Sequence, residues 1–323
     1  MIDFRYHLVS LVSVFLALAV GIVLGAGPLK ESIGDTLTQQ VQSLRKEKDA
    51  LRAELNTADA AINHRDDWTA SVSPLLMDGQ LASRTVVVVV LPGVDGDTVK
   101  SVTDGLASAG ATLTGRVDIQ GQWTDEERAD FRDQLATQLS STVPVSITAD
   151  GSSDVTAARL AALLGRALLT TSVTTSSIDA PARTVLEALG GGDLIKVNGD
   201  ITQRADGVVI LAPANQPDNA TSTPTATGAL SPIDAYVALA TALDKAGSGT
   251  VVSGPASSAN GGGVVAAVRS DGDVADVVST VDNGGTPMGV VTDVLAMHEQ
   301  FAGRSGSYGF GDGASAPVPS TAS

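Results

Sequence analysis

An uncharged apolar segment, Leu8 to Gly27, constrains this chain more than any other feature. Its only polar side chains belong to Ser10 and Ser13, which can donate hydrogen bonds to carbonyls one helical turn earlier. About 20 residues of helix measure about 30 Å, the thickness of the hydrocarbon core of a bilayer. Since a backbone in lipid must satisfy its own hydrogen bonds, the segment is predicted to be a membrane-spanning helix.

A cleaved signal peptide is the alternative for this segment. Signal peptides have an apolar region of about 7 to 15 residues, which is shorter than this run, and the basic residues before it would be Arg5 alone. We therefore interpret residues 1–29 as an uncleaved membrane anchor. Small residues recur at four-residue spacing and form a face on which a second membrane helix can pack, namely Ala17, Gly21 and Gly25.

A heptad pattern follows the apolar segment. One set of positions recurs every seventh residue and comprises Leu37, Leu44, Leu51 and Ala58. A second set is offset by four residues and comprises Val41, Lys48, Leu55 and Ile62. Together they form the a/d seam of a coiled coil with one cationic interruption. Because such a seam is buried only by pairing, residues 30–66 are predicted to be a stalk that forms a homodimer or binds a partner helix. A single helix folded back on its own domain is the alternative.

The rest of the chain is acidic. The formal net charge is −16, and 29 acidic residues against 14 basic ones lie beyond His64. Such a surface repels phosphate backbones, so no nucleic-acid partner is predicted. Cysteine is absent, which excludes disulfides without identifying a compartment. Few charges flank the apolar segment, so they indicate its orientation only weakly. Arg5 before the segment favours a cytoplasmic amino terminus, and the large acidic remainder of the chain is then expected to be the exported domain.

Residues 67–303 alternate predicted strands with predicted helices. The β-branched run from Thr85 to Leu91 is typical of a strand that is buried on both faces of a parallel sheet. Further strands are predicted at 111–119, 207–211, 250–253 and 264–268, and helices at 97–109, 125–139, 155–169, 182–189, 233–246 and 273–278. Residues 289–302 are predicted to be a helix, or a strand that continues into one. The alternation predicts an exported α/β domain with a mostly parallel sheet covered by helices. Residues 304–323 are rich in glycine, serine, proline and alanine, which predicts a disordered tail.

Polar residues crowd the end of one predicted element, beside Gly284-Gly285: Ser279, Thr280, Asp282 and Asn283. In open α/β sheets such ends carry ligand or partner sites, so these residues are a candidate site. A hydrogen-bonded turn with a purely structural role is the alternative.

Other chemistry has little support in the sequence. The turn from Leu91 to Gly96 follows a strand and opens a helix, but it contains neither a P-loop nor G-x-G-x-x-G, so we interpret it as a tight turn. A hydrolytic triad would need His298, the one histidine beyond the stalk, so no catalytic residues are predicted. Met297-His298-Glu299 is the only local cluster that contains the methionine and histidine side chains that soft metal ions prefer, so Met297 and His298 are weak candidates for a metal site. No metal site is predicted, because adjacent residues on a helix point in different directions.

Three motifs resemble a known family. They are the opening Met1-Ile-Asp-Phe-Arg-Tyr-His-Leu-Val-Ser-Leu11, the run Ser279-Thr-Val-Asp-Asn283 and Ser307-Tyr-Gly309. With the apolar segment and the heptads, they make the chain similar over nearly its whole length to the actinobacterial family of mycobacterial copper transport protein B. The resemblance implies copper transport or homeostasis and an outer-membrane location. Corynebacterial members are described as SteB, a coiled-coil partner of the division protein SteA, which implies the alternative of an envelope scaffold without metal.

Copper enters through this resemblance alone. Copper(I) prefers thiolate and thioether ligands, followed by imidazole, whereas this chain has no cysteine, four methionines and three histidines. We therefore predict no resident cofactor. The predicted protein is a non-enzymatic, single-span membrane protein of the copper transport family. It is expected to be dimeric through its stalk and to present its domain to envelope or division partners.

Overall fold

The computed structural model describes the chain except for residues 1–3, 27, 146–154, 173–176, 216–230 and 321–323. The chain divides into two compact units, Met1–Arg65 and Asp66–Ser323. In the first unit, helix α1 (Phe4–Ala26) contains a stretch, Phe4–Gly25, that is long and apolar enough to cross a membrane, with a mean hydropathy of 2.7. The Ser13 hydroxyl donates to the Val9 carbonyl at 2.8 Å, as expected for a serine in an apolar helix.

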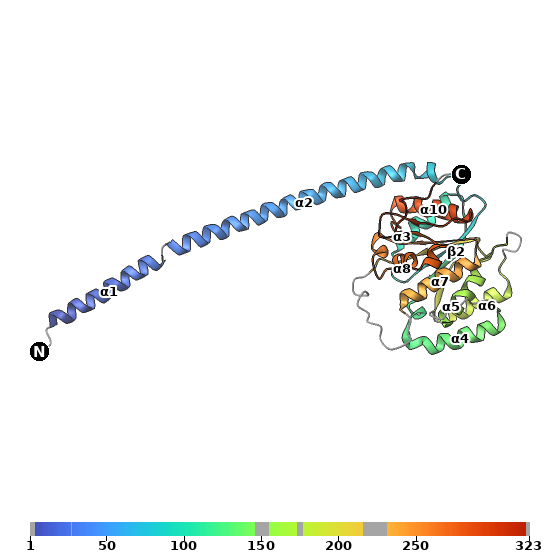
Figure 1. Cartoon of the computed structure of the whole chain (residues 1–323), viewed down its shortest axis with the longest axis horizontal. Helices are drawn as coiled ribbons and strands as arrows, with labels where there is room; N and C mark the ends of the chain where they lie inside the picture. The colour runs from blue at the N-terminus through green and yellow to red at the C-terminus, as the bar shows by residue number, and fades with distance from the viewer. Residues whose placement is uncertain (1–3, 27, 146–154, 173–176, 216–230, 321–323) are drawn as a thin grey trace. The chain divides into compact units, whose positions relative to one another are not determined.

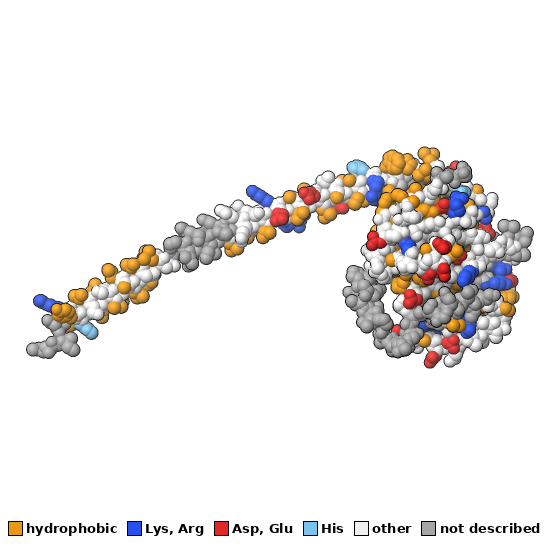
Figure 2. Space-filling view, in the orientation of Figure 1, with side chains coloured by type: hydrophobic (Ala, Val, Ile, Leu, Met, Phe, Trp, Pro, Cys, Tyr) orange, Lys and Arg blue, Asp and Glu red, His pale blue; other side chains and the backbone are white. Residues whose placement is uncertain are grey.

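Helix α2 (Pro28–Met77) begins in the first unit and ends in the second. Figure 2 shows hydrophobic side chains covering α1, whereas charged side chains appear along α2. The last turns of α2 belong to the second unit, where Thr69, Ser73 and Met77 are buried at four-residue spacing. That spacing places one face of the helix against the domain.

The second unit is an α/β domain, as predicted. Seven strands of the described chain form one sheet in the order β3-β2-β1-β4-β5-β6-β7, and every pairing except β2 with β3 is parallel. The strands are β1 (Thr85–Val90), β2 (Thr112–Ile119), β3 (Ile195–Asn198), β4 (Gly207–Leu211), β5 (Gly249–Ser253), β6 (Ser279–Val281) and β7 (Ser307–Tyr308).

Helices cover both faces of the sheet (Figure 1). One face carries α3 (Gly96–Ser108) and α10 (Pro287–Phe301). The other carries α4 (Ala129–Thr142), α5 (Val155–Leu168), α6 (Ala180–Gly191), α7 (Pro232–Ala246), α8 (Val264–Ser270) and α9 (Gly272–Ala275), with short 3-10 turns at Gly121–Trp123, Glu126–Arg128 and Ala256–Ala259. Valines alternate between the two cores: Val86 and Val88 pack toward α3 and α10, and Val87 and Val89 pack the other way. This explains why β1 is apolar throughout.

One predicted strand is wrong. Residues 264–268 lie in helix α8, in which Val264, Val265 and Val268 are buried. Positions i, i+1 and i+4 lie on one face of a helix, so the valines suit an amphipathic helix. The β-branched composition had suggested a strand instead. Residues 289–302, for which both types were open, lie largely in helix α10, which starts at Pro287 after the Thr286 cap. Strands β3, β6 and β7 were not predicted, because two to four residues give no periodicity.

Candidate functional site

The predicted polar cluster lies at the carboxyl end of β6, next to the end of β5. Ser279 and Thr280 are within β6, and Asp282 and Asn283 follow it directly. In the parallel register, Ser253 at the end of β5 is level with Val281. Ser279, Thr280 and Asp282 are buried, and the amide atoms of Asn283 are shielded from solvent as well.

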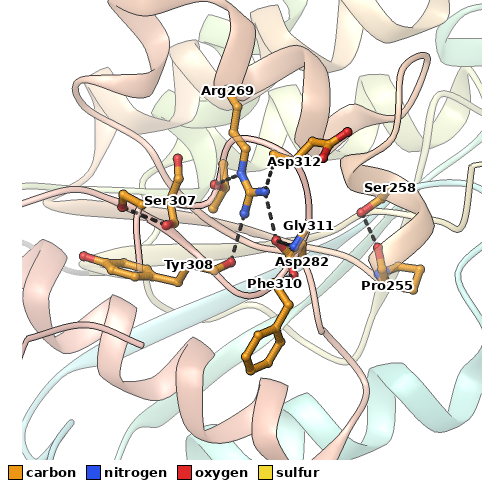
Figure 3. Close-up of polar contacts among 11 residues, drawn as sticks. Pro255, Ser258, Arg269, Asp282, Ser307, Tyr308, Phe310, Gly311 and Asp312 are labelled. Atoms are coloured by element: carbon orange, nitrogen blue, oxygen red, sulfur yellow. Dashed lines mark hydrogen bonds and ion pairs between the residues drawn. The ribbon is translucent and has the colours of Figure 1, made fainter. Parts of the chain in front are cut away.

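Asp282 forms a buried ion pair with Arg269 of helix α8 (Figure 3). Nη1 of Arg269 lies 2.9 Å from Oδ2 of Asp282, and the two side chains are only 4% and 1% exposed. The Nε of Arg269 donates to Thr280 Oγ1 at 2.9 Å. Its two terminal nitrogens also donate to the carbonyls of Tyr308, at 2.9 Å, and Asp312, at 2.8 Å. The guanidinium therefore connects α8, β6 and the C-terminal segment, residues 304–320.

The Asp282 carboxylate also binds the C-terminal segment directly. Its two oxygens accept hydrogen bonds from the backbone N–H groups of Phe310 and Gly311, each at 2.8 Å. Gly309, just before them, has φ +124°, and a Cβ there would lie 2.0 Å from Asp282 Oδ1. Only glycine fits this close approach, which gives the Ser-Tyr-Gly motif a physical reason.

Residues 304–320 are consequently not a disordered tail, contrary to the prediction from composition. Ser307–Tyr308 forms β7 beside β6, and Arg269 and Asp282 fix the turn that follows. The Tyr308 hydroxyl donates to the buried Glu299 carboxylate, which also pairs with Arg304 at 3.1 Å. Burial and the Glu299 carboxylate raise the pKa of Tyr308 well above its usual range.

Ser279, Thr280 and Asp282 all have partners inside the domain. Oγ of Ser279 accepts from Gln300 Nε2 at 2.9 Å, and the other two side chains bind Arg269. This arrangement matches the structural alternative for these residues, and a ligand or partner site at them stays a prediction.

Ser253 and Asp293 are buried on the α10 side of this edge, and Asn283 lies next to it in the chain with its amide atoms shielded. Within the described part of the chain, the Asn283 amide has no hydrogen-bond partner, and the Asp293 carboxylate contacts the Ser253 hydroxyl. Burial raises the pKa of Asp293 to about 7. A hydrogen bond from the Ser253 hydroxyl opposes that rise.

Met297 and His298 lie in different surroundings. Met297 is fully buried beneath the sheet, where a Cβ on Gly207 would lie 3.0 Å from its Sδ. His298 is exposed, and its Nδ1 lies 2.8 Å from the Gln80 carbonyl. Among the described residues, no group of three histidine, cysteine or acidic side chains is placed to hold a metal ion.

The seam of α2 is exposed in the single chain. Exposure of its large apolar side chains ranges from 41% to 64%, for Leu37, Val41, Leu44, Leu51, Leu55 and Ile62. Lys48 and Ala58 are exposed as well, and Lys48 Nζ lies 3.8 Å from the neighbouring Asp49 carboxylate. In α1, a Cβ built on Gly21 or Gly25 would meet nothing within 4 Å.

Sequence reasoning missed Arg269, Ser253 and Asp293. Asp293 had a signal, because it is the one charged residue in the apolar run from Val290 to Met297. Arg269 had none, since a basic residue at the end of a short helix is ordinarily solvated.

A membrane-compatible helix, a long second helix and an α/β domain together describe a membrane-associated protein with a separate folded domain. The chain belongs to the MctB family: the family model described as "Copper transport outer membrane protein, MctB" matches residues 1–319. Relatives named "Copper transporter MctB" from Mycobacterium tuberculosis and Mycobacterium bovis are 31% identical over 333 residues, covering 97% of this chain and 98% of the relative. The relative of the same name from Mycobacterium leprae is 30% identical over 331 residues, with the same coverage. The resemblance seen in the sequence is thereby confirmed, and the family name describes transport.

Proposed function

We propose that this protein serves copper transport or homeostasis at a membrane by self-association and partner binding, without catalysis. The family and the relatives' names support the copper context. The anchor of residues 1–29 holds the chain in the bilayer, and residues 30–66 form a homodimeric coiled coil. The domain, residues 67–303 with the C-terminal segment packed on it, presents a surface to envelope proteins.

The exposed seam of α2 is the observation that carries this proposal. Burying a leucine side chain contributes about 1.5–3 kcal/mol, and this helix exposes four leucines, a valine and an isoleucine on its seam. An isolated helix gains nothing from this spacing, whereas two helices bury both sets at once. A second copy of the chain carries the same exposed seam and is present wherever the protein is made, so it is the simplest partner.

Cysteine crosslinking tests the pairing, because the chain has no cysteine of its own. Leu51→Cys lies on the seam, and Ala53→Cys lies on the opposite side of the same turn as a matched control. In a parallel dimer the Leu51→Cys residues approach within disulfide range, so the full chain in detergent should crosslink rapidly, and the control should not. Equal crosslinking of both variants, or none of either, would refute a seam dimer.

Copper handling is proposed to need an assembly of several chains or partners. The donors that copper(I) prefers are scarce in this sequence, and Met297 and His298 do not share one site. A single span per chain lines a path only as an oligomer, and the small-residue face of Ala17, Gly21 and Gly25 fits close helix packing. Calorimetric titration of the full chain with copper should therefore show no tight stoichiometric site; a saturable site would establish direct binding.

The amino terminus is proposed to be cytoplasmic and the acidic domain extracytoplasmic. A single cysteine at exposed Ser108, on α3, reports this in intact cells. A membrane-impermeant maleimide should label Ser108→Cys without permeabilisation. Labelling that needs permeabilisation would reverse the orientation. The family description places the span in an outer membrane, which cell fractionation of the same variant tests.

A division or envelope scaffold without metal, as described for SteB, is the second candidate. The combination of a long exposed seam with few soft metal donors favours it. Changing Leu44 and Leu51 together to Asp places charges in the seam and should remove both the dimer and any helical partner from pull-downs of the full chain. An unaltered partner set would exclude binding through the coil.

A further inference from the structure

A groove of about 500 Å³ lies between helix α3 and the part of the sheet formed by β2 and β3. Its walls come from the first turns of α3, the middle of β2 and the turn after β3, which reaches Asp200. The volume falls within the range of small-molecule sites, about 300–1,000 Å³. Three strands, β1, β4 and β5, separate β2 from β6, so the groove is distinct from the polar cluster around Asp282.

A bulge in β2 places Thr114 at this groove. Val86 of β1 pairs with Leu113 and Val87 pairs with Gly115, so Thr114 is an extra residue between two regular pairs. Bulges of this kind redirect a side chain. Thr114 lines the groove and is only 6% exposed, and among the described residues its hydroxyl has no hydrogen-bond partner. Because buried hydroxyls are almost always paired, this one is suited to bind a molecule in the groove.

Arg116 and Asn198 bring two more hydrogen-bonding groups to the groove. Val117 and Ile119 pack in the core on the other face of the sheet, so alternation places Arg116 on the α3 face. Its Nε and Nη2 donate to the Asp118 carboxylate at 2.8 and 2.9 Å, and Asn198 Nδ2 donates to the same carboxylate at 2.8 Å. Asp118 thereby fixes both side chains. In the described chain, these bonds leave Arg116 Nη1 and Asn198 Oδ1 for a ligand.

The charges of the groove are balanced. Its lining has two basic side chains, Lys100 and Arg116, and two acidic ones, Asp104 and Asp200. Lys100 pairs with Asp104 one turn along α3, and Arg116 pairs with Asp118. Neither a positive nor a negative excess is present to hold an ion, so the lining favours a neutral ligand over phosphate or a metal cation.

Apolar side chains complete the lining. Val88 and Val99 belong to the core beneath α3, Leu113 packs against it, and all three also border the groove. A matching ligand therefore carries hydroxyl groups that both donate and accept hydrogen bonds, together with an apolar C–H face. A sugar ring has this combination.

We propose that the groove between α3 and β2 binds a neutral carbohydrate. The Thr114 hydroxyl donates or accepts, Arg116 Nη1 donates and Asn198 Oδ1 accepts, which suits the hydroxyl groups of a sugar. Val88, Val99 and Leu113 contact the C–H face of the ring. The proposal does not depend on the coiled coil or on copper handling, because every residue of the groove lies in the second unit.

Saturation-transfer difference NMR on the full chain tests this binding. The chain is held in a polyoxyethylene detergent, because glycoside detergents would themselves supply a sugar. Maltose, cellobiose and trehalose are titrated separately, with the acyclic polyol sorbitol for comparison. At least one disaccharide should show saturable transfer to its ring protons, sorbitol should show none, and inorganic phosphate should not displace the sugar. Absence of saturable transfer to all three disaccharides, or displacement by phosphate, would overturn the proposal.

Thr114→Val keeps the shape of the side chain and should raise the Kd of the bound disaccharide roughly fivefold to tenfold. Thr103→Val is the matched control. Thr103 also lines the groove, but its hydroxyl already donates to the Val99 carbonyl at 2.6 Å, so the Kd should not change. Thr114→Ser restores a hydroxyl and should restore binding.

The sugar-free Thr114→Val protein should be at least as stable as the wild type, since an unpaired buried hydroxyl is lost, which separates weaker binding from unfolding. An unchanged Kd in Thr114→Val, or an equal rise in both valine variants, would overturn the proposal.

Discussion

Replacing Arg269 by methionine gives the sharpest test of what holds the C-terminal segment on the domain. Methionine keeps most of the side-chain length. It removes the charge and the four hydrogen bonds that the guanidinium donates to Thr280, Asp282, Tyr308 and Asp312. The Asp282 carboxylate, 1% exposed, then retains only the two backbone N–H groups of Phe310 and Gly311. A buried charge is left without its counter-ion.

The expected loss of stability is large. Breaking a buried ion pair from one side costs about 3–5 kcal/mol. For a domain of this size each kcal/mol lowers the Tm by about 2–4 °C, so Arg269→Met should lose roughly 6 to 20 °C. Changing Asp282 to Asn in the same chain removes the orphaned charge, so the double variant should lose less than the two single variants combined.

Two measurements on the full chain in detergent check this. Tryptophan fluorescence of a Trp68→Phe background, in which the buried Trp123 is the one indole left, gives the Tm, and hydrogen exchange reports residues 304–320 separately. Arg304→Met is the control, because Arg304 pairs with Glu299 in the same region but is 51% exposed, and it should cost less than about 1 kcal/mol. The reasoning is refuted if Arg269→Met behaves like Arg304→Met and the exchange of the C-terminal segment is unchanged.

Three further outcomes are expected. Lys48→Ile should raise the melting temperature of the helical signal of α2 in circular dichroism, because an apolar a position pairs better than a cationic one; an unchanged value would place Lys48 outside the seam. Gly309→Ala should destabilise the domain in urea unfolding by more than the roughly 1–2 kcal/mol that a positive φ alone costs, because the added Cβ also meets Asp282. Gly303→Ala is the control, since Gly303 has φ +75° and open space around it, and it should show only the backbone cost. Equal effects of the two variants would contradict the close approach at Gly309. Burial raises the pKa of Asp244 to about 6 from an ordinary 3.8, so the folded state binds this proton more tightly than the unfolded state does. The free energy of unfolding should therefore fall as pH rises from about 4 to about 6. Asp244→Asn should make the free energy of unfolding less dependent on pH over that interval, and an unchanged dependence would assign it to another group.

The parts of the fold that repeat along the chain were predictable from sequence. The length of the apolar segment predicts a membrane-spanning helix, and the unbroken valine run of β1 predicts a strand buried on both faces. Residues 264–268 failed because a five-residue stretch rich in valine fits a strand and a short helix equally well. The antiparallel β3 at the edge also gave no signal, since four residues, Ile195–Asn198, are too few to show alternation.

The sequence predicted where the polar cluster around Asp282 lies, but it did not predict which residues its side chains bind. Asp282 stood out because polar residues crowd a strand end, yet its partner Arg269 lies on another helix and the bound N–H groups lie nearly thirty residues onward. Such contacts depend on how the sheet is ordered, which spacing along the chain does not encode. The same holds for Asp293 and Ser253, which meet only because α10 packs on β5.

The strand order places the usual ligand crevice of doubly wound sheets between β1 and β4, yet this chain closes it to phosphate. Gly93, with φ +93°, turns the chain tightly beside Pro213, 3.3 Å from where a Cβ would stand. The Asp95 carboxylate then caps α3 through Thr98 N at 2.8 Å, and this bond with the Thr98 hydroxyl lowers the pKa of Asp95. A fixed negative charge thus occupies the helix terminus that would otherwise bind an anion. Likeness to nucleotide-binding folds therefore gives no argument about function here.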